Sequence, residues 1–259
     1  MTHPFQQTSF DLTNRAALIT GAGVGIGQAS AIALARAGAT VGIHYHSSVE
    51  GAKATLAAVE LAGGRGVLLR GDLTREADAN RVVDEFIEFA GRLDIVFNNA
   101  GNPLQRSSIE DCPTDLWKQA FDVNVHSAFF VTRRAIPRLK VSGHGSIINN
   151  LSLSVQTGGS GGAGSYAAAK GALQVFTRTL SRELAPLVRA NAIMPGVVET
   201  RHHEVFTTPE KMEDYRRQTP LARNSQADEI AQTVLYLASD ASSFVTGALI
   251  DLNGGRFLR

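Results

Sequence analysis

A glycine-rich turn between a strand and a helix constrains the fold of this chain more than any other feature. Residues 15–20 (RAALIT) are a short apolar run that predicts a buried strand. The run GAGVGIG follows at once at residues 21–27, and residues 28–37 predict an alanine-rich helix that ends before Gly38. Glycines let the backbone turn tightly, and a helix N-terminus offers unpaired N–H groups and partial positive charge to a phosphate. In this context the motif favours a dinucleotide site over a plain turn.

Strands and helices alternate along the rest of the chain, as in a parallel sheet with crossover helices. Apolar runs predict six more strands, at residues 40–45, 66–70, 93–97, 145–151, 189–194 and 248–252. Helices are expected at residues 49–62, 75–90, 115–140, 166–185 and 226–238. We therefore predict a doubly wound, Rossmann-like α/β fold, a three-layer sandwich with a seven-stranded parallel sheet, as one domain over residues 1–259. Ligands are expected at the carboxyl ends of the strands.

Composition narrows the kinds of partner that the chain can have. The net charge of +1 gives no sign of a polyanion partner, so we expect no nucleic acid. No stretch approaches the roughly 20 apolar residues of a membrane span, and residues 1–11 lack a signal pattern, so we expect a cytoplasmic protein. Cys112 is the only cysteine, which excludes an intramolecular disulfide. We expect no metal site, because the adjacent residues of His202-His203-Glu204 would face different ways on a helix.

The end of the second predicted strand bears on the choice of dinucleotide. An acidic residue at this place would bond the ribose 2′-hydroxyl and favour NAD. The sequence instead has Tyr45, His46, Ser47 and Ser48, with no carboxylate before Glu50. A 2′-phosphate would meet no repulsion there and could bond the serines and the imidazole. NADP(H) is therefore favoured, with NAD(H) as the alternative. The preceding His44 is interpreted as an ordinary strand-end residue.

Polar residues follow the next two predicted strands. Asp72 could reach an adenine edge, or it could cap the helix at residues 75–90 together with Thr74, and both interpretations remain open. Asn98 and Asn99 precede Ala100-Gly101, where amides that both donate and accept suit a polar scaffold as well as a turn.

Tyr166 and Lys170 lie four residues apart in a predicted helix, so their side chains leave the same face. An ammonium group beside a phenol favours the phenolate and should lower the pKa of the tyrosine. Such a tyrosine can exchange a proton with an alcohol near neutral pH. Taken alone, the same pattern also describes a surface helix.

Together these elements resemble the short-chain dehydrogenase/reductase family in its compact single-domain form. The resemblance covers nearly the whole chain, in the family's order and with roughly its spacing. The matching elements are TGAGVGIG (20–27), Asp72-Leu73, NNAG (98–101), Asn124 within DVNV, YAAAK (166–170), PGVVET (195–200) and VTGALIDLNGG (245–255). Within the family, the chain is most like 3-oxoacyl-[acyl-carrier-protein] reductases and sugar or polyol dehydrogenases.

The resemblance implies a role for each catalytic candidate. Tyr166 would be the general acid or base, and Lys170 would lower its pKa and hold the nicotinamide ribose. Asn124 would hold a water that links Lys170 to solvent, or would make a structural hydrogen bond across the sheet. The family's usual gap of thirteen before the tyrosine falls on Leu153, which cannot serve. Strand register favours Ser152 as the catalytic serine, with Ser154 as the alternative.

The resemblance also implies contacts for the cofactor and the substrate. Cofactor contacts are expected from Gly21, Gly23, Gly25, Ile26, Gly27, Tyr45, His46, Ser47, Ser48, Asp72, Leu73, Asn99, Ala100, Gly101, Tyr166, Lys170, Pro195, Gly196, Val198 and Thr200. Residues 201–223 would form a lid over a small-molecule substrate, and the glycine-rich loop 158–164 would be either a wall with room for a bulky substrate or a drifted surface loop. A homotetramer is implied, with residues 226–238 and 248–252 at an interface.

The expected activity is NAD(P)-dependent interconversion of a secondary alcohol and a ketone. The substrate would be a 3-oxoacyl thioester or a sugar or polyol. The alternatives are a lyase or epimerase on the same scaffold, and a non-catalytic regulator that senses the dinucleotide.

Overall fold

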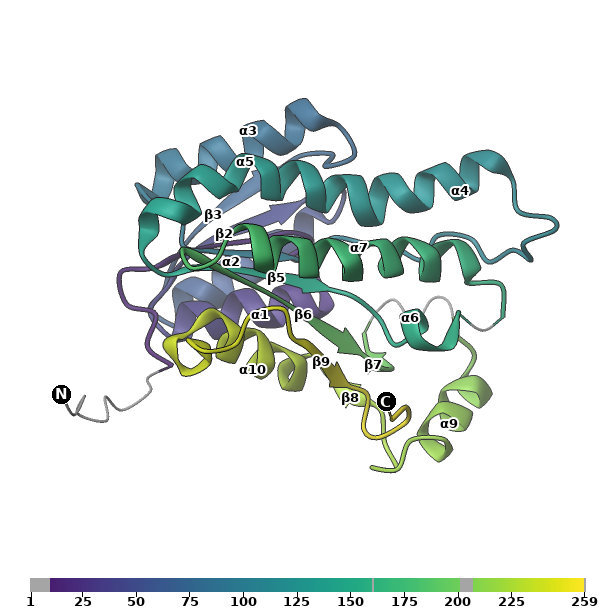
Figure 1. The fold of residues 1–259 in the computed structure, drawn as a ribbon. Helices are drawn as coiled ribbons and strands as arrows, with labels where there is room; N and C mark the ends of the chain where they lie inside the picture. The colour runs from purple at the N-terminus through teal and green to yellow at the C-terminus, as the bar shows by residue number, and fades with distance from the viewer. Residues whose placement is uncertain (1–9, 160, 201–206, 259) are drawn as a thin grey trace.

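Seven parallel strands form the central sheet in a computed structural model of the protein, which describes residues 10–159, 161–200 and 207–258 (Figure 1). The strand order is β3-β2-β1-β4-β5-β6-β9. These strands are β1 (Ala16–Ile19), β2 (Thr40–Tyr45), β3 (Arg65–Arg70), β4 (Ile95–Asn98), β5 (Gly145–Asn150), β6 (Val188–Pro195) and β9 (Leu249–Leu252). All six pairings between neighbours are parallel, which confirms the predicted fold.

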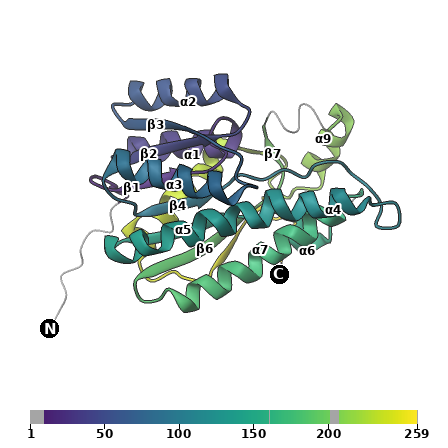
Figure 2. The same ribbon diagram turned by 90° about the horizontal axis from the view of Figure 1, so that it is seen from above.

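Helices cover both faces of the sheet (Figures 1 and 2). One face carries α1 (Gly25–Arg36), α2 (Val49–Leu61) and α10 (Ala227–Ala238); the other carries α3 (Glu76–Ala90), α5 (Ser127–Ser142) and α7 (Gly164–Glu183). Alternate β1 residues divide between the two cores: Ala17 and Ile19 pack in the first, Ala16 and Leu18 in the second. Burial on both sides explains why the strands read as continuous apolar runs. No helix in the described part of the chain is both long and apolar enough to cross a membrane.

Shorter elements depart from the predicted pattern. The single helix expected at residues 115–140 is α4 (Thr114–Phe121), a π-helical segment η1 (Asp122–His126) and α5. The remaining short elements are α6 (Ser154–Thr157), β7 (Val198–Glu199), α9 (Pro209–Arg217), β8 (Ser225–Gln226) and the 3₁₀ turn η2 (Asp240–Ser242). β7 and β8 pair with each other, which brings the segment after β6 against the start of α10.

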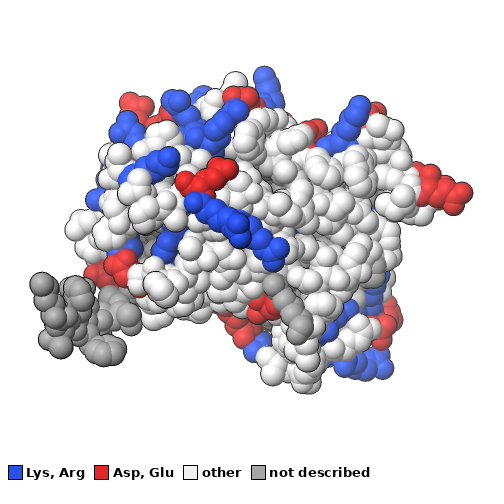
Figure 3. All heavy atoms as spheres, in the orientation of Figure 1, with Lys and Arg blue, Asp and Glu red and all other residues white. Residues whose placement is uncertain are grey.

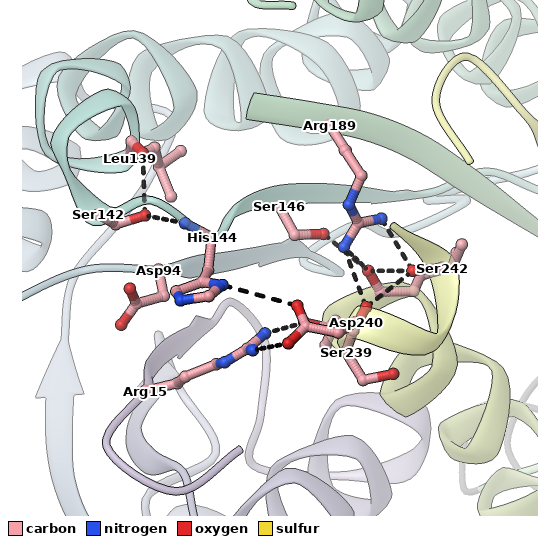
Figure 4. Close-up of polar contacts among 12 residues, drawn as sticks. Arg15, Asp94, Leu139, Ser142, His144, Ser146, Arg189, Ser239, Asp240 and Ser242 are labelled. Carbon is pink, nitrogen blue, oxygen red and sulfur yellow. Dashed lines mark hydrogen bonds and ion pairs between the residues drawn. The ribbon is translucent and has the colours of Figure 1, made fainter. Parts of the chain in front are cut away.

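A polar network anchors the end of α10 at the amino ends of the strands (Figure 4). Arg15, just before β1, is hydrogen-bonded and ion-paired to Asp240 at 2.5 Å. Arg189 at the start of β6 donates to the Ser242 hydroxyl at 2.8 Å and to the Leu237 carbonyl at 2.9 Å. Ser146 in β5 donates to the same Leu237 carbonyl at 2.9 Å. This network holds together the amino ends of the strands. The carboxyl ends, on the opposite side of the sheet, remain open to ligands.

Candidate active site

A cavity of about 890 Å³ lies at the carboxyl edge of the sheet. The chain leaves β1 towards β2 on one side, whereas β4 pairs with β1 on the other. The carboxyl ends at such a reversal of strand order are where open α/β sheets bind ligands. The predicted site residues that line the cavity are Gly21, Gly25, Ile26, Asn99, Ala100, Gly101, Ser152, Ser154, Tyr166, Pro195, Gly196, Val198 and Thr200.

The glycine turn folds back so tightly that side chains are excluded from it. Gly21 and Gly25 have φ of +64° and +59°, and a Cβ on Gly27 would lie 2.3 Å from the Gly21 carbonyl oxygen. The Asn99 amide donates to the carbonyls of Thr20 at 2.9 Å and Gly21 at 3.1 Å, which ties the turn to the end of β4. α1 begins at Gly25, so its first N–H groups open beside the cavity. These features fit a dinucleotide pyrophosphate.

His44 has a larger role than the sequence indicated. Its side chain is 2% exposed at the end of β2, where Nδ1 accepts from the Gly21 N–H and Nε2 contacts the Gly71 carbonyl oxygen, both at 3.1 Å. Only the neutral Nε2–H tautomer satisfies both contacts, because the amide must donate and the carbonyl must accept. Burial lowers the pKa of His44 to about 4. The imidazole therefore links the glycine turn to the segment after β3.

The residues expected at the adenosine end do not line this cavity. Tyr45 ends β2, His46 and Ser47 follow it, and Ser48 precedes α2, where its side chain lies near Gly23. The Asp72 carboxylate accepts from the Thr74 N–H at 3.1 Å and from its hydroxyl at 2.8 Å, in a turn that leads into α3. Leu73 is buried in the core beneath α3. The capping interpretation is wrong, because Arg75 is the N-cap of α3 and no side chain caps this helix, whereas a contact of Asp72 with the adenine stays a prediction.

Tyr166 and Lys170 project from the first turns of α7 towards the end of β5. The Ser152 hydroxyl is hydrogen-bonded to the Tyr166 hydroxyl. Lys170 is 2% exposed, and its ammonium group donates to the Asn150 carbonyl at 2.7 Å. The Lys170 Nζ atom lies 5.7 Å from the centroid of the Tyr166 ring.

The sequence predicts a lowered pKa for Tyr166, and the structure contradicts this prediction. Burial raises the pKa of Tyr166 to about 12, and the hydrogen bond from Ser152 opposes this rise. Burial also lowers the pKa of Lys170 to about 8. Desolvation disfavours the charged form of each group, and this outweighs their mutual attraction. Without a further cation nearby, Tyr166 is a neutral phenol at physiological pH.

Ser152 and Ser154 are partners rather than interchangeable candidates. The Ser154 N–H donates to the Ser152 Oγ at 3.1 Å, and the Ser154 hydroxyl donates to the same oxygen at 2.9 Å. A hydroxyl oxygen has two lone pairs, so these contacts leave the Ser152 proton to point at Tyr166. Ser154 begins α6, and its contacts orient Ser152.

Asn124 is completely buried within the π-helical segment. Its amide group donates to the carbonyls of Asn102 and Ala120, both at 2.9 Å, and its Oδ1 accepts from the Asn102 N–H at 3.1 Å. The structural hydrogen bond therefore reaches the loop after β4 and the preceding turn of helix, and not across the sheet as expected. A Cβ on Gly101 would lie 2.7 Å from this Oδ1 and 3.0 Å from the Lys170 Nζ, so glycine is needed where the two groups approach.

The cavity also has lining residues that the sequence did not single out as site residues. They include Asn150 at the end of β5, Arg106 in the loop after β4, Tyr215 and Gln218 at the end of α9, and Arg256 after β9. The glycine-rich loop meets this group, because the Gly162 carbonyl accepts from the Ser107 N–H at 2.9 Å. Of the predicted lid, residues 201–206 lie outside the described residues, including His202, His203 and Glu204.

The sheet order, the glycine turn and the tyrosine–lysine pair define a Rossmann-type dinucleotide enzyme. A family model described as enoyl-(acyl carrier protein) reductase matches residues 21–256. The chain belongs to the short-chain dehydrogenase/reductase family, and it is an oxidoreductase with a nicotinamide dinucleotide as cofactor.

Individual relatives match over nearly their whole length. The cyclopentanol dehydrogenase of Comamonas sp. is 33% identical, over 94% of this chain and 97% of that protein. Among solved structures, a short-chain dehydrogenase/reductase described as a glucose/ribitol dehydrogenase from Brucella melitensis has 33% identity and a TM-score of 0.89, covering 97% of this chain and 100% of that one. A 7α-hydroxysteroid dehydrogenase complexed with NADH and 7-oxo glycochenodeoxycholic acid has 30% identity and a TM-score of 0.91, covering 97% and 98%.

Proposed function

We propose that the protein interconverts a secondary alcohol and a ketone, with Tyr166 as the group that moves the proton. The observation that carries this proposal is that Ser152 and Tyr166 line the same cavity, with the buried Lys170 one helical turn from Tyr166. When bound, the nicotinamide supplies or accepts the hydride. The protein's residues manage the proton and the charge on the substrate oxygen.

Each side chain has a distinct task in this mechanism. In the reductive direction, Tyr166, which is protonated at physiological pH, donates its proton to the carbonyl oxygen. Ser152 donates a hydrogen bond to the same oxygen and stabilises the charge that develops there. Lys170 holds the nicotinamide ribose, and its positive charge favours the phenolate left behind. Asn124 fixes the backbone of Asn102 and carries the water link to Lys170.

The dinucleotide would bind at the carboxyl ends of the same strands. The N-terminus of α1 and Thr200 hold the pyrophosphate; a Cβ on Gly25 would lie 3.2 Å from the Thr200 Cγ2, so the threonine adjoins the turn. NADP(H) is favoured over NAD(H), since residues 45–48 carry no carboxylate and the Glu50 carboxylate is ion-paired to Lys53 at 2.9 Å. NADH is bound by the related hydroxysteroid dehydrogenase, so both forms belong in the test.

The substrate is a 3-oxoacyl thioester or a sugar or polyol, under a lid that includes α9. Tyr215 and Gln218 line the cavity from this helix, which supports the lid assignment. The names of two relatives, for cyclopentanol and for glucose or ribitol, support a ring alcohol or a polyol as the substrate. A dinucleotide-sensing regulator is the second candidate, but Tyr166, Lys170, Asn124 and Ser152 are all in place, which favours an enzyme.

The test follows nicotinamide absorbance with NADPH and then NADH across ketoses, alicyclic ketones, steroids and 3-oxoacyl thioesters. We expect Tyr166→Phe to lower turnover by about 10²-fold or more, because general acid catalysis is lost. Cofactor affinity should be nearly unchanged. Tyr236→Phe, a matched change on α10 outside the cavity, should retain wild-type turnover.

Turnover that survives in Tyr166→Phe would show that another group moves the proton. Tight binding of reduced cofactor without turnover of any compound would favour the sensor.

A further inference from the structure

The charged side chains that line the cavity are all cationic in the part of the chain that the structure describes. They are Arg106 and Arg256; no Asp or Glu shares the lining with Tyr166. A wall that carries two guanidinium groups makes the cavity electropositive, and the low-dielectric walls strengthen the effect. A neutral polyol or ketone would gain nothing from this charge, whereas an anion would.

Two contacts hold the Arg256 side chain in place, and most of its N–H groups are not used by them. Its guanidinium group lies 4.5 Å from the centroid of the Tyr215 ring and donates to the Gln218 Oε1 at 2.8 Å. An arginine has five N–H donors, so the contact with Gln218 leaves others to face the cavity. Arg256 forms no ion pair within the described ranges.

Other arginines of this region differ from Arg256. On α9, Arg216 is paired with Glu213 at 2.7 Å and Arg217 with Asp214 at 3.3 Å. Opposite charges accordingly lie side by side on the outer surface of this helix (Figure 3). Arg256 thus lines the cavity without an ion pair among the described residues, unlike these two arginines of α9.

A second cationic group lies on the glycine-rich side of the cavity. Arg106 donates to the Gly161 carbonyl at 3.1 Å. A Cβ on Gly161 would lie 3.3 Å from the Arg106 Nη1 and 3.7 Å from the Lys211 Nζ, so α9 contributes a further ammonium group to the same place. The glycines of this loop let the two cations approach the backbone closely.

We propose that the substrate carries a carboxylate or phosphate remote from its reacting carbon, and that Arg256 binds this anion, with Arg106 adding charge. The proposal rests on the function proposed above, because Tyr166 and Ser152 must hold the other end of the substrate. A guanidinium group binds either anion through two parallel hydrogen bonds, which orients the substrate as well as attracting it. Arg256 is therefore a specificity-determining residue.

Pairs of compounds with and without an anionic group test this proposal. The carboxylate arm compares 3-oxocyclohexanecarboxylate with 3-oxocyclohexanecarboxamide. The phosphate arm compares acetoacetyl-coenzyme A with acetoacetyl-N-acetylcysteamine, which lacks the phosphates. We expect wild-type kcat/KM to favour the anion by about tenfold or more in one arm, and that arm identifies the kind of anion.

Three variants locate the effect. Arg256→Gln should abolish the preference and leave turnover of the neutral compound within about threefold, whereas Arg256→Lys should retain part of it. Arg216→Gln removes the same charge from the outer face of α9 and should leave the preference intact. A wild-type enzyme without preference in both arms, or an unchanged preference in Arg256→Gln, would overturn the proposal.

Calorimetric binding separates this proposal from the proposed activity. Cyclohexanecarboxylate and cyclohexanecarboxamide, which have no ketone to reduce, are titrated into the protein with reduced cofactor, and adenosine 3′,5′-bisphosphate replaces them for the phosphate arm. Binding of an anion that needs Arg256 supports the anion site even if no ketone is turned over. Turnover of the ketones without any anion preference or Arg256-dependent binding leaves the oxidoreductase and removes the anion site.

Discussion

Single side chains at the end of β5 decide the chemistry of the site. Ser152 receives two hydrogen bonds from Ser154, and this arrangement was not predictable, because two nearby serines look equivalent in a sequence. The raised pKa of Tyr166 was not predictable either, since it follows from burial that only the packed α7 creates. Tyr166 and Lys170 themselves were found because i, i+4 spacing is visible in the sequence.

We expect Ser154→Ala to lower kcat about fivefold, because one hydrogen bond that orients Ser152 is lost, worth about 1 kcal/mol. KM for the cofactor should not change, and Ser154→Thr should restore most of kcat by replacing the hydroxyl. Steady-state kinetics on the best substrate measure both. An alanine variant with wild-type kcat would show that the backbone N–H of Ser154 suffices.

The sequence predicts the main strands and helices, but it does not predict every short element or every contact between elements. The main strands and helices were predictable because apolar runs and glycine or proline boundaries mark them. The π-helical segment at Asn124 was not, since its apolar spacing continues that of α4 and α5, and the two-residue strands β7 and β8 are too short to give a pattern. Arg256 was missed because it follows the last strand without a motif, and only the fold places it beside Tyr215 and Gln218.

His44, at the end of β2, makes the stability of the fold depend on pH. The native protein keeps this imidazole neutral down to about pH 4, whereas the unfolded chain takes up a proton near pH 6.5. Between these values the unfolded state binds more protons, so the free energy of unfolding must fall as the pH falls, by about 3 kcal/mol in all. Below pH 4 this contribution changes no further.

Urea unfolding at several pH values between 7 and 4 measures this slope. His44→Gln should have a shallower slope, because an amide can accept from Gly21 and donate to Gly71 without titrating. His46→Gln, a change at an exposed neighbour whose charge adds a smaller part to the lowering of the His44 pKa, should keep most of the wild-type slope. Equal slopes in all three proteins would assign the acid sensitivity to other groups.

The whole molecule has apolar surface on two sides. The part of this face to the right of the central blue group is uncharged in Figure 3, and Trp117 on α4, Phe129 on α5 and Val175 on α7 are exposed. Phe244 is fully exposed between η2 and β9. Exposed apolar patches of this kind mark interaction sites, and the homotetramer that the family resemblance implies stays a prediction.

We expect light scattering to give the mass of four 27.6 kDa chains. Phe244→Glu should reduce this to the mass of two, because an unpaired charge at the α10–β9 interface is costly to bury. Leu61→Glu, at an equally exposed site on α2, should leave the tetramer intact. A monomeric wild-type protein would contradict the assignment.

The cavity borders on four strands, because its walls come from the ends of β1, β4, β5 and β6. β1 and β4 are neighbours in the sheet, where Ile19 pairs with Phe97, although α1 to α3 lie between them in the chain. The site therefore needs both halves of the chain, because a fragment that ends before β6 has the glycine turn but lacks the opposite wall of the cavity. Removing either half of the chain therefore removes one wall of the site.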